Sequence, residues 1–139
     1  MRSIAFVAVL LMLAGCAGTK KIVEVNKLNG NWVPTVQEMN GAPVPRDFMD
    51  NMKLTIADSV YVVSAESMDK GVIRYHGNKM DIYGREGANQ GKHFTAIYKY
   101  ENDMLTICYN LKGDSYPSEF ETKGQPMFFI SVFKREDKK

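Results

Sequence analysis

The stretch IRYHGNKMDI at residues 73–82 decides the fold class. Its centre, Gly77-Asn78, is a favoured two-residue loop for a β-hairpin. Pairing outward from this loop places apolar side chains on one face and charged or polar ones on the other, which is typical of a half-buried antiparallel pair. The pairs are Tyr75 with Met80, Ile73 with Ile82, Arg74 with Asp81 and His76 with Lys79.

Two more hairpins follow from loops at Asn102-Asp103 and Asp58-Ser59. The pairs are Tyr100 with Leu105, Tyr98 with Ile107, Ala96 with Tyr109, Ile56 with Tyr61 and Leu54 with Val63. A first strand around 32–39 and a last one around 127–135 complete eight strands in meander order, the number that closes a small barrel. The sequence therefore predicts an all-β fold, a small eight-stranded antiparallel up-and-down barrel with one short helix at 46–52. A two-layer sandwich of the same strands is the rival architecture.

The N-terminal residues form a short apolar segment that ends at a cysteine. Arg2 precedes an apolar run too short to span a bilayer, and Leu13-Ala14-Gly15-Cys16 follows. This segment resembles a bacterial lipoprotein signal with its lipobox. The resemblance implies cleavage of residues 1–15, a lipidated tether at 16–27 and a barrel domain at 28–136. It also implies lipid on Cys16 and a stable anchor in the cell envelope. Ala17 after the cysteine favours the periplasmic face of an outer membrane if the host is Gram-negative.

Charge and cysteine content exclude other classes. The formal charge is +2 before Arg2 is removed, and basic residues are scattered among acidic ones, so nothing indicates a nucleic-acid partner. Of the two cysteines, Cys16 is assigned to lipid, which leaves Cys108 without an intramolecular disulfide partner. Roughly 124 residues after the signal suit one domain.

Six short segments of residues 28–136 carry a resemblance to a known family. They are Leu28-Asn29-Gly30-Asn31-Trp32, Asn40-Gly41-Ala42-Pro43-Val44-Pro45, Ile97-Tyr98-Lys99-Tyr100, Leu105-Thr106-Ile107-Cys108-Tyr109, Tyr116-Pro117-Ser118-Glu119-Phe120 and Phe133-Lys134-Arg135-Glu136. With these segments the chain resembles a family of uncharacterised lipocalin-like domains that is common in planctomycetes and occurs in other bacterial lipoproteins. Two positions depart from the family pattern, Tyr116 where Arg is usual and Ala96 where Gly is usual. The resemblance implies that Trp32 closes the barrel base and that Arg135, or alternatively Lys134, stacks on it as a cation–π contact. It implies a fold and an envelope setting, but no substrate.

No catalytic or metal-binding constellation with suitable spacing is visible. His76 and His93 are far from any second ligand in sequence, so neither a metal nor a cofactor is expected. His76 is interpreted as a solvated strand end and His93 as the start of a strand. Cys108 is interpreted as a packed structural thiol, because nothing indicates the lowered pKa of a nucleophile. The sequence thus predicts a protein that is not an enzyme.

The remaining roles are binding roles. The predicted barrel interior comprises Leu54, Ile56, Tyr61, Val63, Ile73, Tyr75, Met80, Ile82, Phe94, Tyr98, Tyr100, Leu105, Ile107 and Tyr109. A small apolar or amphipathic molecule inside the barrel is one hypothesis, and its candidate contacts are Tyr61, Tyr75, Phe94, Tyr98, Ile107 and Tyr109.

The alternative is a protein-binding module, such as an inhibitor of an envelope-attacking hydrolase or an assembly partner. It would act through the loop 111–126, a functional loop or a flap over one barrel end, with Tyr116, Glu119 and Phe120. Glu119 is either a polar group at the barrel mouth or a hydrogen-bond anchor for that loop.

Overall fold

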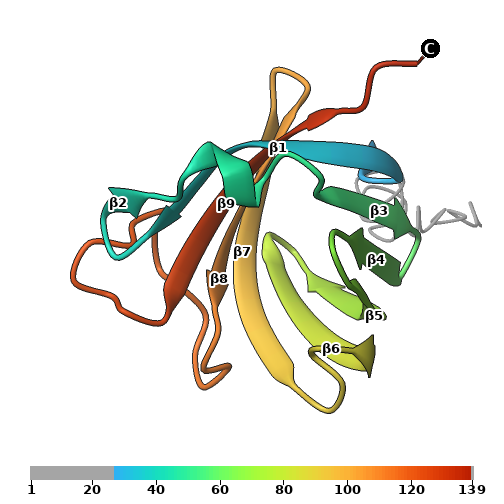
Figure 1. The fold of residues 1–139 in the computed structure, drawn as a ribbon. Helices are drawn as coiled ribbons and strands as arrows, with labels where there is room; N and C mark the ends of the chain where they lie inside the picture. Colours follow the sequence, from blue (N-terminus) through green and yellow to red (C-terminus); the bar gives the residue numbers. More distant parts are fainter. Residues whose placement is uncertain (1–26, 139) are drawn as a thin grey trace, which may run out of the picture.

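The computed structural model describes residues 27–138, so the predicted signal peptide, Cys16 and most of the tether lie outside the described residues. The chain forms antiparallel strands almost throughout (Figure 1). The strands are β1 (Gly30–Met39), β2 (Ala42–Pro43), β3 (Lys53–Ala57), β4 (Val60–Ser64), β5 (Met68–His76), β6 (Lys79–Gly87), β7 (His93–Glu101), β8 (Met104–Asn110) and β9 (Phe128–Arg135). Within this range the structure has no helix with the length and hydrophobicity that a membrane span requires.

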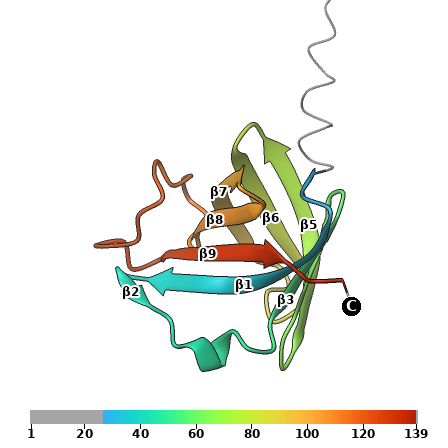
Figure 2. The ribbon, with the colours of Figure 1, turned by 90° about the horizontal axis from the view of Figure 1, so that it is seen from above.

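The sheet closes on itself. Its order is β2-β1-β3-β4-β5-β6-β7-β8-β9, and β1 pairs with β9 as well as with β3. Figure 2 shows β1 and β9 side by side at this seam. Since β2 is a two-residue strand folded back on β1, the wall has eight strands. The predicted up-and-down barrel is confirmed, and the sandwich alternative is not the observed architecture.

The hairpin registers confirm the pairs predicted from the turns. Tyr75 pairs with Met80, Tyr98 with Ile107, and Ile56 with Tyr61. The turns need backbone at positive φ, which Gly, Asn and Asp tolerate best, and the loop residues Asp58, Gly77, Asn102 and Asp103 all adopt it. Turn chemistry therefore fixes which side chains enter the barrel.

The predicted helix at 46–52 is smaller than expected. A single 3-10 turn, η1, covers Arg46–Phe48, and its residues are not buried. One turn fixes several backbone dihedrals for few hydrogen bonds, and Phe48 at its end stays 70% exposed, so packing of that side chain does not extend the helix. The segment is a connector between β2 and β3.

Apolar side chains converge inside the barrel. The interior cluster contains all fourteen residues that the alternation predicts, together with Leu28, Trp32, Ala96 and Phe133. One end of the barrel carries the three tight hairpin loops at 58–59, 77–78 and 102–103 and the entry of the chain at Leu28. We call it the closed end. The opposite end carries the segments 65–67 and 88–92 and the start of the loop after β8, and we call it the mouth.

The long segment 111–127 has no strand or helix and packs along the outer wall of the barrel. Tyr116 and Phe120 contact a second, outward-facing apolar cluster of Ile97, Cys108 and Ile130. Thr122 also meets the β1–β2 hairpin, where its hydroxyl accepts a hydrogen bond from the Gly41 amide at 2.9 Å. The expectation of a flap over a barrel end is therefore wrong, because the aromatic side chains of the loop pack against the outer wall.

Candidate ligand-binding cavity

A cavity of about 320 Å³ lies inside the barrel and opens at the mouth. Its walls come from most of the strands and from the segments that surround the mouth. The lining residues are Gln37, Met52, Leu54, Ile56, Tyr61, Val63, Ala65, Ser67, Asp69, Ile73, Met80, Ile82, Ala88, Asn89, Phe94, Ile107, Tyr109, Leu111, Phe129 and Phe133. The volume is at the lower end of the range of small-molecule sites, and the lining is mostly apolar, as in such sites.

Four of the six predicted contact residues line this cavity, namely Tyr61, Phe94, Ile107 and Tyr109. The other two, Tyr75 and Tyr98, belong to the interior cluster but not to the lining. Their rings meet edge to face with centroids 5.9 Å apart, and the Tyr98 hydroxyl donates to the Gly77 carbonyl at 3.0 Å. These two tyrosines fill the barrel toward the closed end.

Trp32 seals the closed end. The side chain is fully buried, and its indole N–H donates to the Leu28 carbonyl at 2.8 Å. The Arg135 guanidinium lies 4.3 Å from the centre of the Trp32 ring. The Tyr100 ring meets the Trp32 ring edge to face, with ring centroids 5.9 Å apart. Arg135 also donates to the Asn29 carbonyl at 2.8 Å. The stacking cation is thus Arg135, not the alternative Lys134. The base of the barrel is held together by side chains of its first and last strands, β1 and β9.

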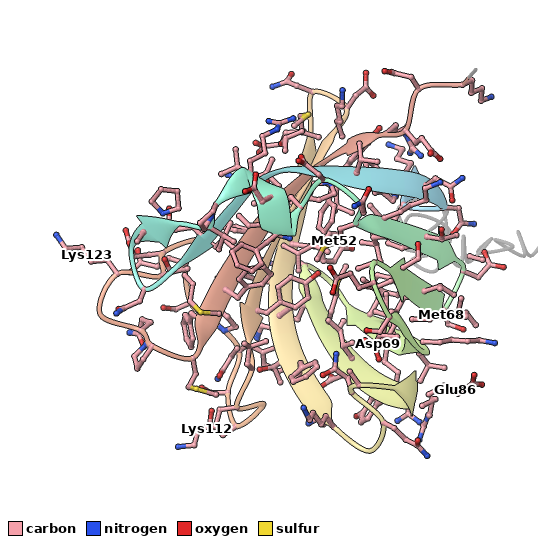
Figure 3. All side chains as sticks on the ribbon, viewed as in Figure 1. Met52, Met68, Asp69, Glu86, Lys112 and Lys123 are labelled. Carbon is pink, nitrogen blue, oxygen red and sulfur yellow. The ribbon has the colours of Figure 1, made fainter. Side chains whose placement is uncertain are left out.

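A polar group interrupts the apolar lining on β5. Asp69 accepts hydrogen bonds from the Tyr61 hydroxyl at 3.3 Å, from the Asn89 side-chain amide at 2.8 Å and from the Asn89 backbone N–H at 3.4 Å. Burial, followed by the negative charge of Asp69, raises the pKa of Tyr61, so its hydroxyl remains a donor at neutral pH. Figure 3 labels Asp69 on β5, near the mouth.

Two glycines lie beside this polar group. Gly71 and Gly84 are paired across β5 and β6. A Cβ on Gly71 would stand 2.0 Å from the Tyr83 carbonyl oxygen and 2.7 Å from the Tyr61 ring, and a Cβ on Gly84 would stand 1.8 Å from the Asn89 carbonyl oxygen. Glycine in a strand interior often marks such a close approach. The absence of side chains at these two positions leaves room for the β6 backbone, the Tyr61 ring and the segment at Asn89 beside Asp69.

Burial also raises the pKa of Tyr109, with the neighbouring hydroxyls of Tyr61 and Tyr75 adding to the effect. The Tyr109 ring packs against Phe129 with centroids 5.8 Å apart. On the seam side of the cavity, the Gln37 amide donates to the Ser131 hydroxyl at 3.2 Å. The cavity therefore combines a broad apolar surface with a few fixed polar atoms near the mouth.

A second polar cluster lies on the outer wall, centred on Asp81. Its carboxylate accepts hydrogen bonds from the Tyr116 hydroxyl at 2.5 Å and from His93 Nε2 at 2.8 Å, and His76 Nε2 lies 3.2 Å away. Burial alone would raise the pKa of Asp81, but the bonds from Tyr116 and His93, with the charges of His93 and His76, hold it below its ordinary value. The interpretation of His76 as a merely solvated strand end therefore misses its contact with Asp81. This cluster fastens the loop to β6.

Phe120, Glu119 and Cys108, which were also singled out in the sequence, belong to the loop and the outer wall that it covers. Phe120 lies beneath the Lys99 ammonium, which is 4.7 Å from the ring centre. Glu119 is exposed, and within residues 27–138 it has no hydrogen bond or ion pair, so other side chains anchor the loop. Cys108 is fully buried beneath the loop, and burial raises the pKa of its thiol to about 11, which fits the packed structural interpretation.

Sequence reasoning missed Asp69, Asn89, Gln37 and Met52. Strand alternation from Ile73 and Tyr75 would have placed Asp69 inside, and the glycines at 71 and 84 were a signal of close approach. Nothing local pointed to Gln37, because a bulge between Pro34 and Val36 shifts the register of β1 against β9. Across the described range there is also no group of three His, Cys, Asp or Glu side chains placed to hold a metal ion.

Comparison with known proteins adds little to this geometry. No protein-family model matches the chain, and no curated protein sequence matches it. Among solved structures it resembles the crystal structure of a single-residue mutant of the fluorescent protein UnaG. The identity is 13%, the likeness covers 82% of this chain and 99% of the other, and the TM-score is 0.41. A likeness at that level carries no functional argument, so the case for a function rests on the cavity itself.

Proposed function

We propose that this protein is a membrane-anchored envelope lipoprotein whose barrel binds a small apolar or amphipathic molecule. The observation that carries the proposal is the apolar cavity of about 320 Å³, sealed by Trp32 at one end and open at the other. A protein core is normally packed without voids of this size, because each lost contact costs free energy. A cavity built from many bulky side chains and kept open is best explained by an occupant.

The geometry of the chain is compatible with the proposed anchor. Leu28 enters at the closed end and packs in the interior cluster with Trp32. A tether that carries lipid on Cys16 would therefore reach the barrel at the end opposite the mouth. If the host is Gram-negative and the anchor lies in its outer membrane, the mouth in this arrangement is free to exchange a ligand with the periplasm. The proposed role is ligand binding.

The alternative, a protein-binding module acting through the loop 111–126, has less support. A filled barrel with an exposed aromatic loop would favour that hypothesis. Instead the barrel has a cavity, while Tyr116 and Phe120 pack against the outer wall. The most exposed aromatic side chain of the described residues is Phe48 on η1, at 70% exposure. An isolated exposed ring does not by itself indicate a partner surface.

Two experiments test the proposal. The mature protein, released gently from membranes of its host, is examined by native mass spectrometry. We expect a bound small molecule of constant mass; a consistently empty barrel that captures one envelope protein would instead favour the alternative.

For the anchor, Cys16→Ser is expected to give a folded protein that no longer sediments with membranes. Retention of the variant on membranes in high salt would show that something other than lipid holds it.

A further inference from the structure

The charge inside the cavity limits which ligand it can take. Among the described residues that line the cavity, Asp69 alone carries a formal charge; no Lys, Arg or His is in the lining. A buried or half-buried carboxylate favours a cationic or hydrogen-bond-donating neighbour and repels another anion, and both effects grow as water is excluded. A ligand with an anionic head group is therefore disfavoured near the mouth.

Asp69 also has acceptor capacity left. An ionised carboxylate offers about four acceptor sites, and the hydrogen bonds from Tyr61 and Asn89 occupy three of them. All three donors are neutral, and within residues 27–138 no cation pairs with this carboxylate. Its charge is held in position by three bonds but is not neutralised. One further donor, above all a cationic one, would complete the arrangement.

The position of Asp69 along its strand sets the orientation of such a ligand. Asp69 is the second residue of β5, at the mouth, and Ile73 lies further along the same inward face toward the closed end. Below Asp69 the lining is apolar as far as Phe133, near the base. A head group at Asp69 would leave an alkyl or ring portion to extend down the barrel among Ile73, Ile107 and Phe133.

We infer that the cavity is selective for amphipathic molecules with a cationic or hydrogen-bond-donating head, such as an alkyl amine, and discriminates against carboxylates of the same shape. The inference rests on the proposed ligand-binding function and adds the chemical class of the head group. Asp69 is the residue that recognises the head, while Tyr61 and Asn89 hold its carboxylate in place. The apolar lining supplies affinity without regard to charge.

The test uses decylamine, decanol and decanoate, which share one alkyl chain and differ in the head group. The mature protein is held in phosphatidylcholine nanodiscs at neutral pH and labelled with ¹³C in its methionine methyl groups. Met52 and Met80 line the cavity, and Met39 on β1 is 41% exposed, so binding inside is distinguished from contact with lipid. Affinities are referred to the ligand concentration in the aqueous phase.

We expect decylamine to bind most tightly and decanoate most weakly. Asp69→Asn should weaken decylamine binding about tenfold or more, because it removes a charge-assisted hydrogen bond, and should change decanol binding much less. The matched control is Glu86→Gln, which removes a carboxylate from an exposed position on the neighbouring strand (Figure 3). It should leave all three affinities unchanged.

The outcomes distinguish the head-group preference from ligand binding itself. Equal or tighter binding of decanoate by the unaltered protein, or an effect of Glu86→Gln as large as that of Asp69→Asn, would overturn the head-group inference and leave the binding function intact. If none of the three molecules shifts the signals of Met52 and Met80, the head-group inference fails, and the binding function fails with it if native mass spectrometry also finds an empty barrel. The ranking in the unaltered protein needs no variant, so it holds even if Asp69→Asn folds poorly.

Discussion

Replacing Trp32 by Ala tests how the barrel is closed. Trp32 has no exposed surface, and truncation of a fully buried aromatic side chain costs about 3–5 kcal/mol. Three specific interactions are lost with it. The edge contact with Tyr100 is worth about 0.5–1.5 kcal/mol, the cation–π contact with Arg135 about 0.5–2 kcal/mol, and the hydrogen bond to Leu28 about 1 kcal/mol.

We therefore expect a loss of free energy of unfolding in the upper part of that range, about 4–5 kcal/mol. With a urea dependence of about 2 kcal/mol per molar, the unfolding midpoint falls by about 2 M. Trp32 is the one tryptophan of the sequence, so unfolding is followed by circular dichroism instead of tryptophan fluorescence.

Trp32→Phe is the matched control, since it keeps an aromatic ring for Arg135 and removes the indole N–H. Its cost should be smaller, about 1–2 kcal/mol, from the unpaired Leu28 carbonyl and a smaller ring. A midpoint for Trp32→Ala within about 0.3 M of the unaltered protein would refute the reasoning, because a side chain that closes the barrel cannot be removed at so small a cost.

Buried polar groups give three further tests. The Tyr75 hydroxyl is buried without a hydrogen-bond partner, so Tyr75→Phe should keep the free energy of unfolding or raise it by up to about 1 kcal/mol. A clear fall in the free energy of unfolding, measured by urea denaturation, would show that the hydroxyl has a partner. Tyr116→Phe removes the donor to Asp81 and should cost about 1–2 kcal/mol, with faster amide exchange in residues 115–122 as the readout. The lowered pKa of Asp81 means that its stabilisation is present above the ordinary carboxyl pKa and is lost as pH falls through the folded-state value. Exchange in that loop should therefore rise below about pH 4, and unchanged exchange there would contradict the role of Asp81.

The sequence predicts the wall of the barrel well because local rules determine it. Gly77 and Asn102 mark turns with a fixed register, and alternation from a known register decides which side chains face inward. The interior residues and the stacking of Arg135 on Trp32 follow from that register and from the resemblance of the two chain ends to lipocalin-like domains.

The loop and the polar part of the cavity were harder to predict, because they depend on contacts between distant segments. The apolar residues Ile97 and Cys108 on the outward face were a sign that something covers that wall, and the covering segment is the loop 111–127. The Asp69 cluster joins β4, β5 and the segment after β6, and only the fold brings these together. A sequence pattern also cannot distinguish a filled barrel from one with a cavity, since the same bulky residues line both.

The most direct test of ligand binding is native mass spectrometry of Ile107→Trp beside the unaltered protein, both purified gently from the host. Ile107 lines the cavity and is almost fully buried, so a larger side chain there fills the space that a ligand needs. Val36→Trp, at an outer position with 49% exposure, is the control for the added ring. We predict a bound molecule in the unaltered protein and in the control, and an empty but folded Ile107→Trp with an unfolding midpoint close to that of the unaltered protein. The same bound mass in all three proteins, or an empty barrel in all three with Ile107→Trp destabilised by about 1–3 kcal/mol through overpacking, would contradict a ligand site inside the barrel.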